Sequence, residues 1–132
     1  PNFATGKAAV GITKNATVSK HALVNANYAC AGNHEHTTFD TTKGRPYMEG
    51  HHLIPCTYTN AKYYWDNQGI NIDCQANIVC LCPTCHRQIH YGSDNAKRTL
   101  IEKLYEESKD KLKSVGLTLT LEELLKLYSI NV

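Results

Sequence analysis

The alternation of apolar and polar residues predicts two short strands separated by a long connection. The stretch Tyr47–Ile54 has the pattern of a strand, which Pro55 ends because proline cannot donate a hydrogen bond to a neighbouring strand. The apolar run at 77–81 predicts a second strand. Residues 56–73 are polar and aromatic, and we expect them to form a loop. Together these segments predict a hairpin whose connection is unusually long.

One helix is predicted before the strands. In Thr17–Tyr28, the first residue suits the N-cap and the apolar residues fall on one face. Residues 1–16 are rich in Gly, Ala, Asn and Thr and show no clear period. We therefore expect a poorly ordered lead-in at 1–16.

Three further helices are predicted after the second strand. The first ends near Gly92, a residue type that suits a helix C-terminus. The second begins after Ser93 as its N-cap and ends near residue 114. The third opens with a capping box of Thr120 and Glu123. Its apolar residues are expected to pack on the core: Leu121, Leu124, Leu125 and Tyr128.

The length and composition of the chain fit one compact α+β domain. A chain of 132 residues, 42% of them hydrophobic, is long enough for one well-packed domain. The formal net charge of +2 neither indicates nor excludes a nucleic-acid partner. With no long apolar run and no secretion leader, we expect a cytoplasmic protein. Because the chain begins with Pro1, we expect it to be a piece of a longer protein, with its domain at 17–132.

The cysteines indicate a metal site. Of the six cysteines, three fall between residues 80 and 85, a clustering that favours a metal over three disulfides. Cys82 and Cys85 are spaced to bind one tetrahedral Zn²⁺ from a tight turn. Cys30 and His34 are the expected partners, and His36 is an alternative to His34. Such a zinc would hold together the two ends of the hairpin, as part of a core at about 28–92 that precedes helices at 93–132.

The histidines indicate a second site. His86 and His90 are four residues apart, so on a helix both imidazoles lie on the same face and can reach one ion. His51 and His52 are neighbours on the first predicted strand, where side chains point to opposite faces. One of them can therefore bind the same ion while the other points towards a substrate.

These residues resemble the ββα-metal motif of HNH nucleases. The stretches PYMEGHHLIP at 46–55 and NIVCLCPTCHRQIHY at 77–91 are similar to those of McrA-type restriction endonucleases, which act on modified DNA. The resemblance covers roughly 28–106. It implies a His-Me finger fold with a zinc-binding knuckle and flanking helices. It departs from the family at Asn33, where many members have a second cysteine in the first zinc turn.

The resemblance also implies roles for single residues. His51, His86 and His90 would hold the catalytic cation, and His52 would be the general base that takes a proton from water. In this family the Asn at position 77 pins the loop that carries the base. The expected reaction is metal-dependent hydrolysis of a DNA phosphodiester, with a 5′ phosphate and a 3′ hydroxyl as products.

Two neighbouring residues have open roles. Arg87 can contact a DNA phosphate, or it can be an ordinary exposed helix residue. Glu49 alternates with His51 on the strand, so it can orient that ligand or lie at the surface.

The expected cofactors and partners follow from the ligands. We expect structural Zn²⁺ and a catalytic Mn²⁺, Co²⁺, Ni²⁺, Zn²⁺ or Mg²⁺, with Mg²⁺ least effective because it prefers oxygen ligands. The expected partner is double-stranded DNA, and cleavage of both strands would favour a homodimer. The alternative is a zinc-stapled DNA-binding module without catalysis, which would need neither the His51-His52 pair nor the helical histidines.

Overall fold

The protein is described here from a computed structural model, which describes residues 3–4, 11–12 and 14–131. It has an α+β fold around a small antiparallel sheet of β3 (Glu49–His52) and β4 (Ile78–Leu81). In the register of this pair, His51 lies opposite Val79 and His52 opposite Ile78. Both predicted strands are therefore present, and the first is shorter than the alternation predicted.

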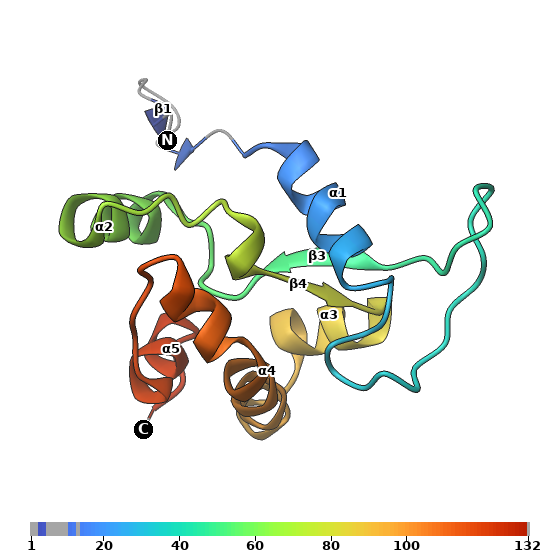
Figure 1. Cartoon of the computed structure of the whole chain (residues 1–132). Coiled ribbons are helices and arrows are strands. Elements are labelled where there is room, and N and C mark those ends of the chain that lie inside the picture. The colour runs from blue at the N-terminus through green and yellow to red at the C-terminus, as the bar shows by residue number, and fades with distance from the viewer. Residues whose placement is uncertain (1–2, 5–10, 13, 132) are drawn as a thin grey trace.

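Helices cover both faces of this sheet. Figure 1 shows α1 (Ala16–Asn25) on one side of the strands and α3 (Pro83–Tyr91) on the other. α1 lies close to β3 at Gly50, where a Cβ would come within 2.1 Å of the Ser19 hydroxyl oxygen. The absence of a side chain at position 50 thus allows the close packing of α1 on the strand.

The C-terminal helices complete the core. α4 (Asp94–Ser114) begins after the Ser93 cap and packs against α3, and α5 (Leu121–Leu127) packs against α4. The capping box at Thr120 is present as predicted. Of the predicted core residues, Leu124 and Leu125 are buried, whereas Leu121 and the C-cap Tyr128 are half-buried against the core. These local signals defined the last two helices correctly.

The prediction of a loop at 56–73 is wrong. This segment contains α2 (Tyr58–Gln68), which is capped by the Thr57 hydroxyl and ends at Gly69 in the left-handed region. Only Ala61 and Tyr64 of α2 are buried, so its apolar pattern is weak although both ends carry cap residues. A 3₁₀ turn, η1 (Gln75–Asn77), then leads into β4.

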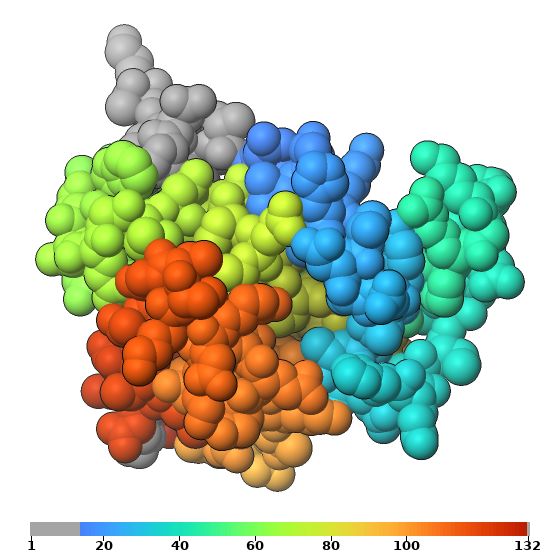
Figure 2. Space-filling view, in the orientation of Figure 1, coloured from blue at the N-terminus to red at the C-terminus, as the bar shows by residue number. Residues whose placement is uncertain are grey.

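The N-terminal prediction needs two corrections. α1 begins at Ala16, and its N-cap is Asn15 rather than Thr17. Within the expected lead-in, β1 (Phe3–Ala4) pairs with β2 (Gly11–Ile12), and residues 1–2, 5–10 and 13 lie outside the described residues. The helices of the described segments are all too short or too polar to cross a membrane. Figure 2 shows the segment around 37–46 projecting from the body of the molecule.

Candidate active site

Three cysteines and one histidine converge at the N-terminus of α3. Cys30, His36, Cys82 and Cys85 place their ligand atoms within 4.8 Å of one another. The Nδ1 atom of His36 lies 3.5 Å from the sulfur of Cys82 and 3.4 Å from that of Cys85. Ligand atoms about 2.0–2.3 Å from a tetrahedral Zn²⁺ would be roughly 3.5–3.8 Å apart. The cluster therefore fits zinc in both chemistry and spacing.

The backbone leaves room for this cluster. A Cβ on Gly32 would come within 2.7 Å of the Cys85 sulfur and 3.4 Å of the Cys30 sulfur. A glycine at this position allows the chain to pass close to both thiols. Cys82 also serves as N-cap of α3, because its sulfur accepts a hydrogen bond from the Cys85 amide.

The fourth member of this cluster is His36, not His34. The turn at 33–36 explains the difference: the Asn33 side chain accepts a hydrogen bond from the Glu35 amide, and the Asn33 carbonyl accepts one from the His36 amide. This turn brings His36 back towards the knuckle. His34 is exposed and is not part of the cluster.

The surroundings of Cys30 favour a thiolate. Burial alone would raise the pKa of this thiol, but hydrogen bonds from the backbone of Cys82, Asn33 and Gly32 and from His36 outweigh it and lower the pKa to about 7. Burial raises the pKa of Cys80 to about 12, and this residue is outside the cluster. Cys30 is thus prepared to act as a metal ligand, whereas Cys80 packs in the core.

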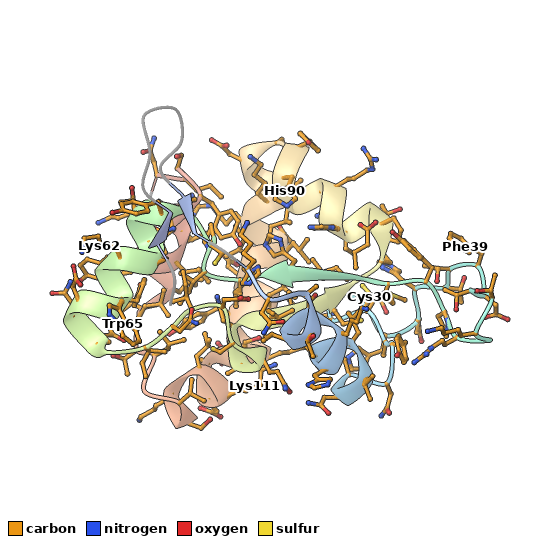
Figure 3. All side chains as sticks on the ribbon, turned by 90° about the horizontal axis from the view of Figure 1, so that it is seen from above. Cys30, Phe39, Lys62, Trp65, His90 and Lys111 are labelled. Carbon is orange, nitrogen blue, oxygen red and sulfur yellow. The ribbon has the colours of Figure 1, made fainter. Side chains whose placement is uncertain are left out.

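A second cluster consists of three imidazoles at the other end of α3. The ring centroids are 5.2 Å apart for His51 and His86, 5.0 Å for His51 and His90, and 4.8 Å for His86 and His90. The Nε2 atoms of His86 and His90 are 3.2 Å apart. Nitrogens that share a tetrahedral ion at about 2.0–2.1 Å would have a similar separation. In Figure 3, Cys30 and His90 lie well apart, so the two clusters are separate.

Burial favours the neutral form of two of these imidazoles, His51 and His90. His51 is only 5% exposed, and burial, together with the nearby imidazoles of His86, His90 and His52, lowers its pKa to about 3. Burial also lowers the pKa of His90, with help from His86 and Lys97. Neutral imidazoles are the protonation state that binds a metal, so the cluster suits a divalent cation.

His52 is paired with a buried carboxylate. Its Nε2 atom lies 2.8 Å from Oδ1 of Asp73, whose side chain is 5% exposed. The other oxygen of Asp73 accepts a hydrogen bond of 2.7 Å from the Asn15 amide. A carboxylate only accepts hydrogen bonds, so it holds the proton of His52 on Nε2 and leaves Nδ1 for chemistry.

Asn77 connects the segments that carry this pair. It is fully buried, and its side-chain nitrogen donates to the carbonyls of Ile54 and Ile72, at 3.1 and 2.8 Å. Its side-chain oxygen accepts a hydrogen bond of 2.8 Å from the Ile54 amide. The side chain thus joins the loop after His52 to the residue before Asp73.

Glu49 contacts His86, not His51. Its Oε1 atom lies 2.8 Å from Nδ1 of His86, and its other oxygen accepts a hydrogen bond of 2.7 Å from the Tyr47 hydroxyl. The hydrogen bonds from Tyr47 and His86 lower the pKa of Glu49. The ionised carboxylate fixes His86 with Nε2 towards the other imidazoles. Arg87 is exposed beside Glu49 and His86.

The imidazoles line a cleft of about 660 Å³. Its wall includes Lys14, Lys97 and Tyr128 as well as His51 and His52. The Tyr128 hydroxyl lies 2.8 Å from Nε2 of His51, and burial raises the pKa of this phenol. The cleft therefore combines three candidate ligands, an oriented imidazole and two lysines.

Sequence reasoning missed Asp73 and the polar role of Tyr128. Asp73 is a single acidic residue in a polar segment, without a period or motif to mark it. Tyr128 fits the apolar pattern of the last helix, and nothing in that pattern indicates that its hydroxyl reaches His51.

Comparison with known proteins agrees with this geometry. The family described as HNH endonuclease matches residues 30–93. The type IV methyl-directed restriction enzyme EcoKMcrA of Escherichia coli strain K12 is 41% identical over 76 residues, which are 58% of this chain. The aligned region spans only 23% of that enzyme. The family match contains both clusters, the strand pair and α3, and we conclude that residues 30–93 form an HNH domain similar to that of the McrA-type enzymes.

Proposed function

We propose that this chain is the cleavage domain of a DNA endonuclease that depends on a divalent cation. The observation that carries the proposal is the meeting of His51, His86 and His90 beside His52 in one cleft. A zinc module that only binds DNA does not require three clustered imidazoles next to a histidine that a buried carboxylate orients.

The two clusters would hold different metals for different purposes. Cys30, His36, Cys82 and Cys85 would bind a structural Zn²⁺, and His34 is not required. The three imidazoles would hold the catalytic cation, with Mn²⁺, Co²⁺, Ni²⁺ or Zn²⁺ favoured over Mg²⁺ by their nitrogen donors. A divalent cation bound there offsets negative charge on a phosphate oxygen and on the leaving 3′ oxygen.

The remaining chemistry belongs to residues of the chain. Nδ1 of His52 accepts a proton from a water molecule as the water oxygen bonds to phosphorus. The bond from phosphorus to the 3′ oxygen breaks, and that oxygen takes a proton from solvent. Asp73 stabilises the imidazolium formed on His52 and keeps its ring oriented. The backbone bonds of Asn77 hold His52 and Asp73 in register.

Lysines at the cleft support a nucleic-acid substrate. Lys14 and Lys97 line the cleft, where their ammonium groups can contact phosphates on either side of the scissile bond. Contacts of this kind position a duplex without reading its sequence. We therefore assign cleavage, and not target recognition, to this chain.

The relative suggests a biological setting. EcoKMcrA is described as a methyl-directed restriction enzyme, and the region that aligns with this chain is a small part of its length. We propose that this chain cleaves within a larger restriction enzyme acting on modified double-stranded DNA in the cytoplasm. A homodimer, which would cut both strands, stays a prediction.

A plasmid-nicking assay tests the function. The purified chain, first loaded with one equivalent of Zn²⁺, is incubated with supercoiled DNA and Mn²⁺, Co²⁺, Ni²⁺ or Mg²⁺. We expect nicking with the first three, weaker nicking with Mg²⁺, and only a slow residual rate in His52→Ala. The matched control is His21→Ala, which removes an exposed imidazole from α1, away from the cleft.

The outcomes separate the two candidate functions. DNA binding without nicking under every metal would overturn the nuclease proposal and favour the zinc-stapled binding module. Nicking with Mg²⁺ alone would contradict the three-imidazole site. Equal activity in His52→Ala and His21→Ala would remove His52 from its role as base.

A further inference from the structure

Tyr128 brings a hydroxyl from the C-terminal helix into the imidazole cluster. It lies at the end of α5, outside the region 30–93 that matches the HNH family. Its oxygen is 2.6 Å from the carbonyl oxygen of Leu53 and 2.8 Å from Nε2 of His51. These contacts join residues more than 70 positions apart. The site is therefore built partly by a segment that the family match does not include.

Hydrogen-bonding capacity determines the direction of both contacts. The Leu53 carbonyl can only accept, so the Tyr128 hydroxyl donates its single proton to it. The phenol oxygen can then only accept from His51, which requires a proton on Nε2. A neutral imidazole carries one proton, so Nδ1 of His51 is left with its lone pair.

We propose that Tyr128 is a positioning residue that holds His51 as the Nε2–H tautomer, so that Nδ1 is the atom offered to the catalytic cation. The inference rests on the proposed function only in taking His51 as a ligand of that cation. His86 is held in the complementary way, since Glu49 takes its Nδ1 and leaves Nε2. His51 and His86 thus each have one nitrogen anchored by the protein and the other directed to the ion.

The packing of α5 supports this role. Leu124, Leu125 and Ile130 on either side of Tyr128 are almost fully buried, so the phenol is held in place by the core. The same hydroxyl also bonds to the loop directly after His52. The Tyr128 side chain therefore positions both His51, the proposed ligand, and the start of the loop that follows His52, the proposed base.

Tyr128→Phe tests the proposal because it removes the hydroxyl and keeps the ring. The probe is Ni²⁺, titrated calorimetrically into protein that already holds one equivalent of Zn²⁺. We expect Ni²⁺ affinity to fall roughly 10- to 100-fold, as is typical for losing the hydrogen bond that supports a ligand. The matched control is Tyr105→Phe, which loses a comparable hydroxyl bond to the Leu119 carbonyl, outside the imidazole cluster.

A second measurement reads the tautomer directly. Two-bond ¹H–¹⁵N NMR correlations of the metal-free protein should show His51 protonated on Nε2, with a shift towards the other tautomer in Tyr128→Phe. Ni²⁺ affinity in Tyr128→Phe equal to that of Tyr105→Phe would overturn the proposal. So would protonation of His51 on Nδ1 in the unaltered protein, a result that needs no variant to fold.

These readouts do not depend on DNA cleavage. If the unaltered chain never nicks DNA but loses Ni²⁺ affinity on Tyr128→Phe, the nuclease proposal fails and this inference stands. If it nicks DNA and the affinity and tautomer are unaffected, the nuclease proposal stands and this inference fails.

Discussion

Replacing Asp73 by Asn should reverse the tautomer of His52 while keeping the shape of the side chain. In the native site one carboxylate oxygen faces His52 Nε2 at 2.8 Å and the other accepts from the Asn15 amide at 2.7 Å. The Asn15 amide can only donate, so the oxygen of the new amide must face it. The amide nitrogen then donates to Nε2, and the proton of His52 moves to Nδ1, the atom proposed to act as base.

The expected loss can be estimated from the contact. A hydrogen bond to a charged group contributes about 1.5–3 kcal/mol, and Asp73 is shielded enough from water for this range to apply. At about 1.4 kcal/mol for each tenfold change, nicking should slow roughly 10- to 150-fold. The assay is the initial rate of plasmid nicking with Mn²⁺, alongside circular dichroism and Ni²⁺ titration to verify fold and metal binding.

Two comparisons make this result specific. Asp66→Asn removes an exposed carboxylate from α2, paired with Lys62, and should leave the nicking rate unchanged. In a His52→Ala background, Asp73→Asn should cause no further loss, because residues that act as a unit are not additive. A folded, metal-binding Asp73→Asn protein that nicks at the native rate would refute the reasoning.

Three further predictions concern the metal sites and the core. His36→Ala should lower zinc content and melting temperature, measured by metal analysis and calorimetry, whereas His34→Ala should change neither. Loss of zinc in His34→Ala but not in His36→Ala would contradict the assignment of His36 to the cluster. Asn77→Ala should lower the free energy of unfolding, measured in urea, by about 3 kcal/mol or more, because buried backbone groups lose their partners. The exposed Asn67→Ala should lower it by only about 0.5 kcal/mol. His51 has a folded pKa of about 3 against 6.5 in the unfolded chain, so the unfolded state binds more protons between these values. The free energy of unfolding of the metal-free protein should fall by at most about 1.4 kcal/mol per pH unit as pH falls from about 6.5 to 3. His51→Gln should lack this part of the pH dependence. Identical pH profiles for the two proteins would show that His51 does not carry it.

Local signals account for the parts of the fold that were predicted correctly. Pro83 and the Ser93 cap set the starts of α3 and α4 through the backbone preferences of single residues. Gly92 ends α3 at a point where a Cβ would come within 2.6 Å of the Gln88 carbonyl oxygen. Helical geometry alone places His86 and His90, which are four residues apart, on the same face of α3. α2 was missed because its buried face is small and its apolar period is correspondingly weak.

The sequence by itself determined the chemistry available: the Cys-x-x-Cys knuckle, the histidine pair on a helix, the adjacent histidines on a strand and Asn77 at the start of the second strand. Only the tertiary structure decided how they are used. The turn at 33–36 chose between two histidines, and contacts across 21 and 77 positions brought Asp73 to His52 and Tyr128 to His51. Spacing along a chain predicts only which neighbours share a face. Partners that are distant in sequence meet because packing brings their elements together: α1 and α3 lie on the small sheet, α4 lies on α3, and α5 lies on α4. Polar groups buried by this packing pair with one another.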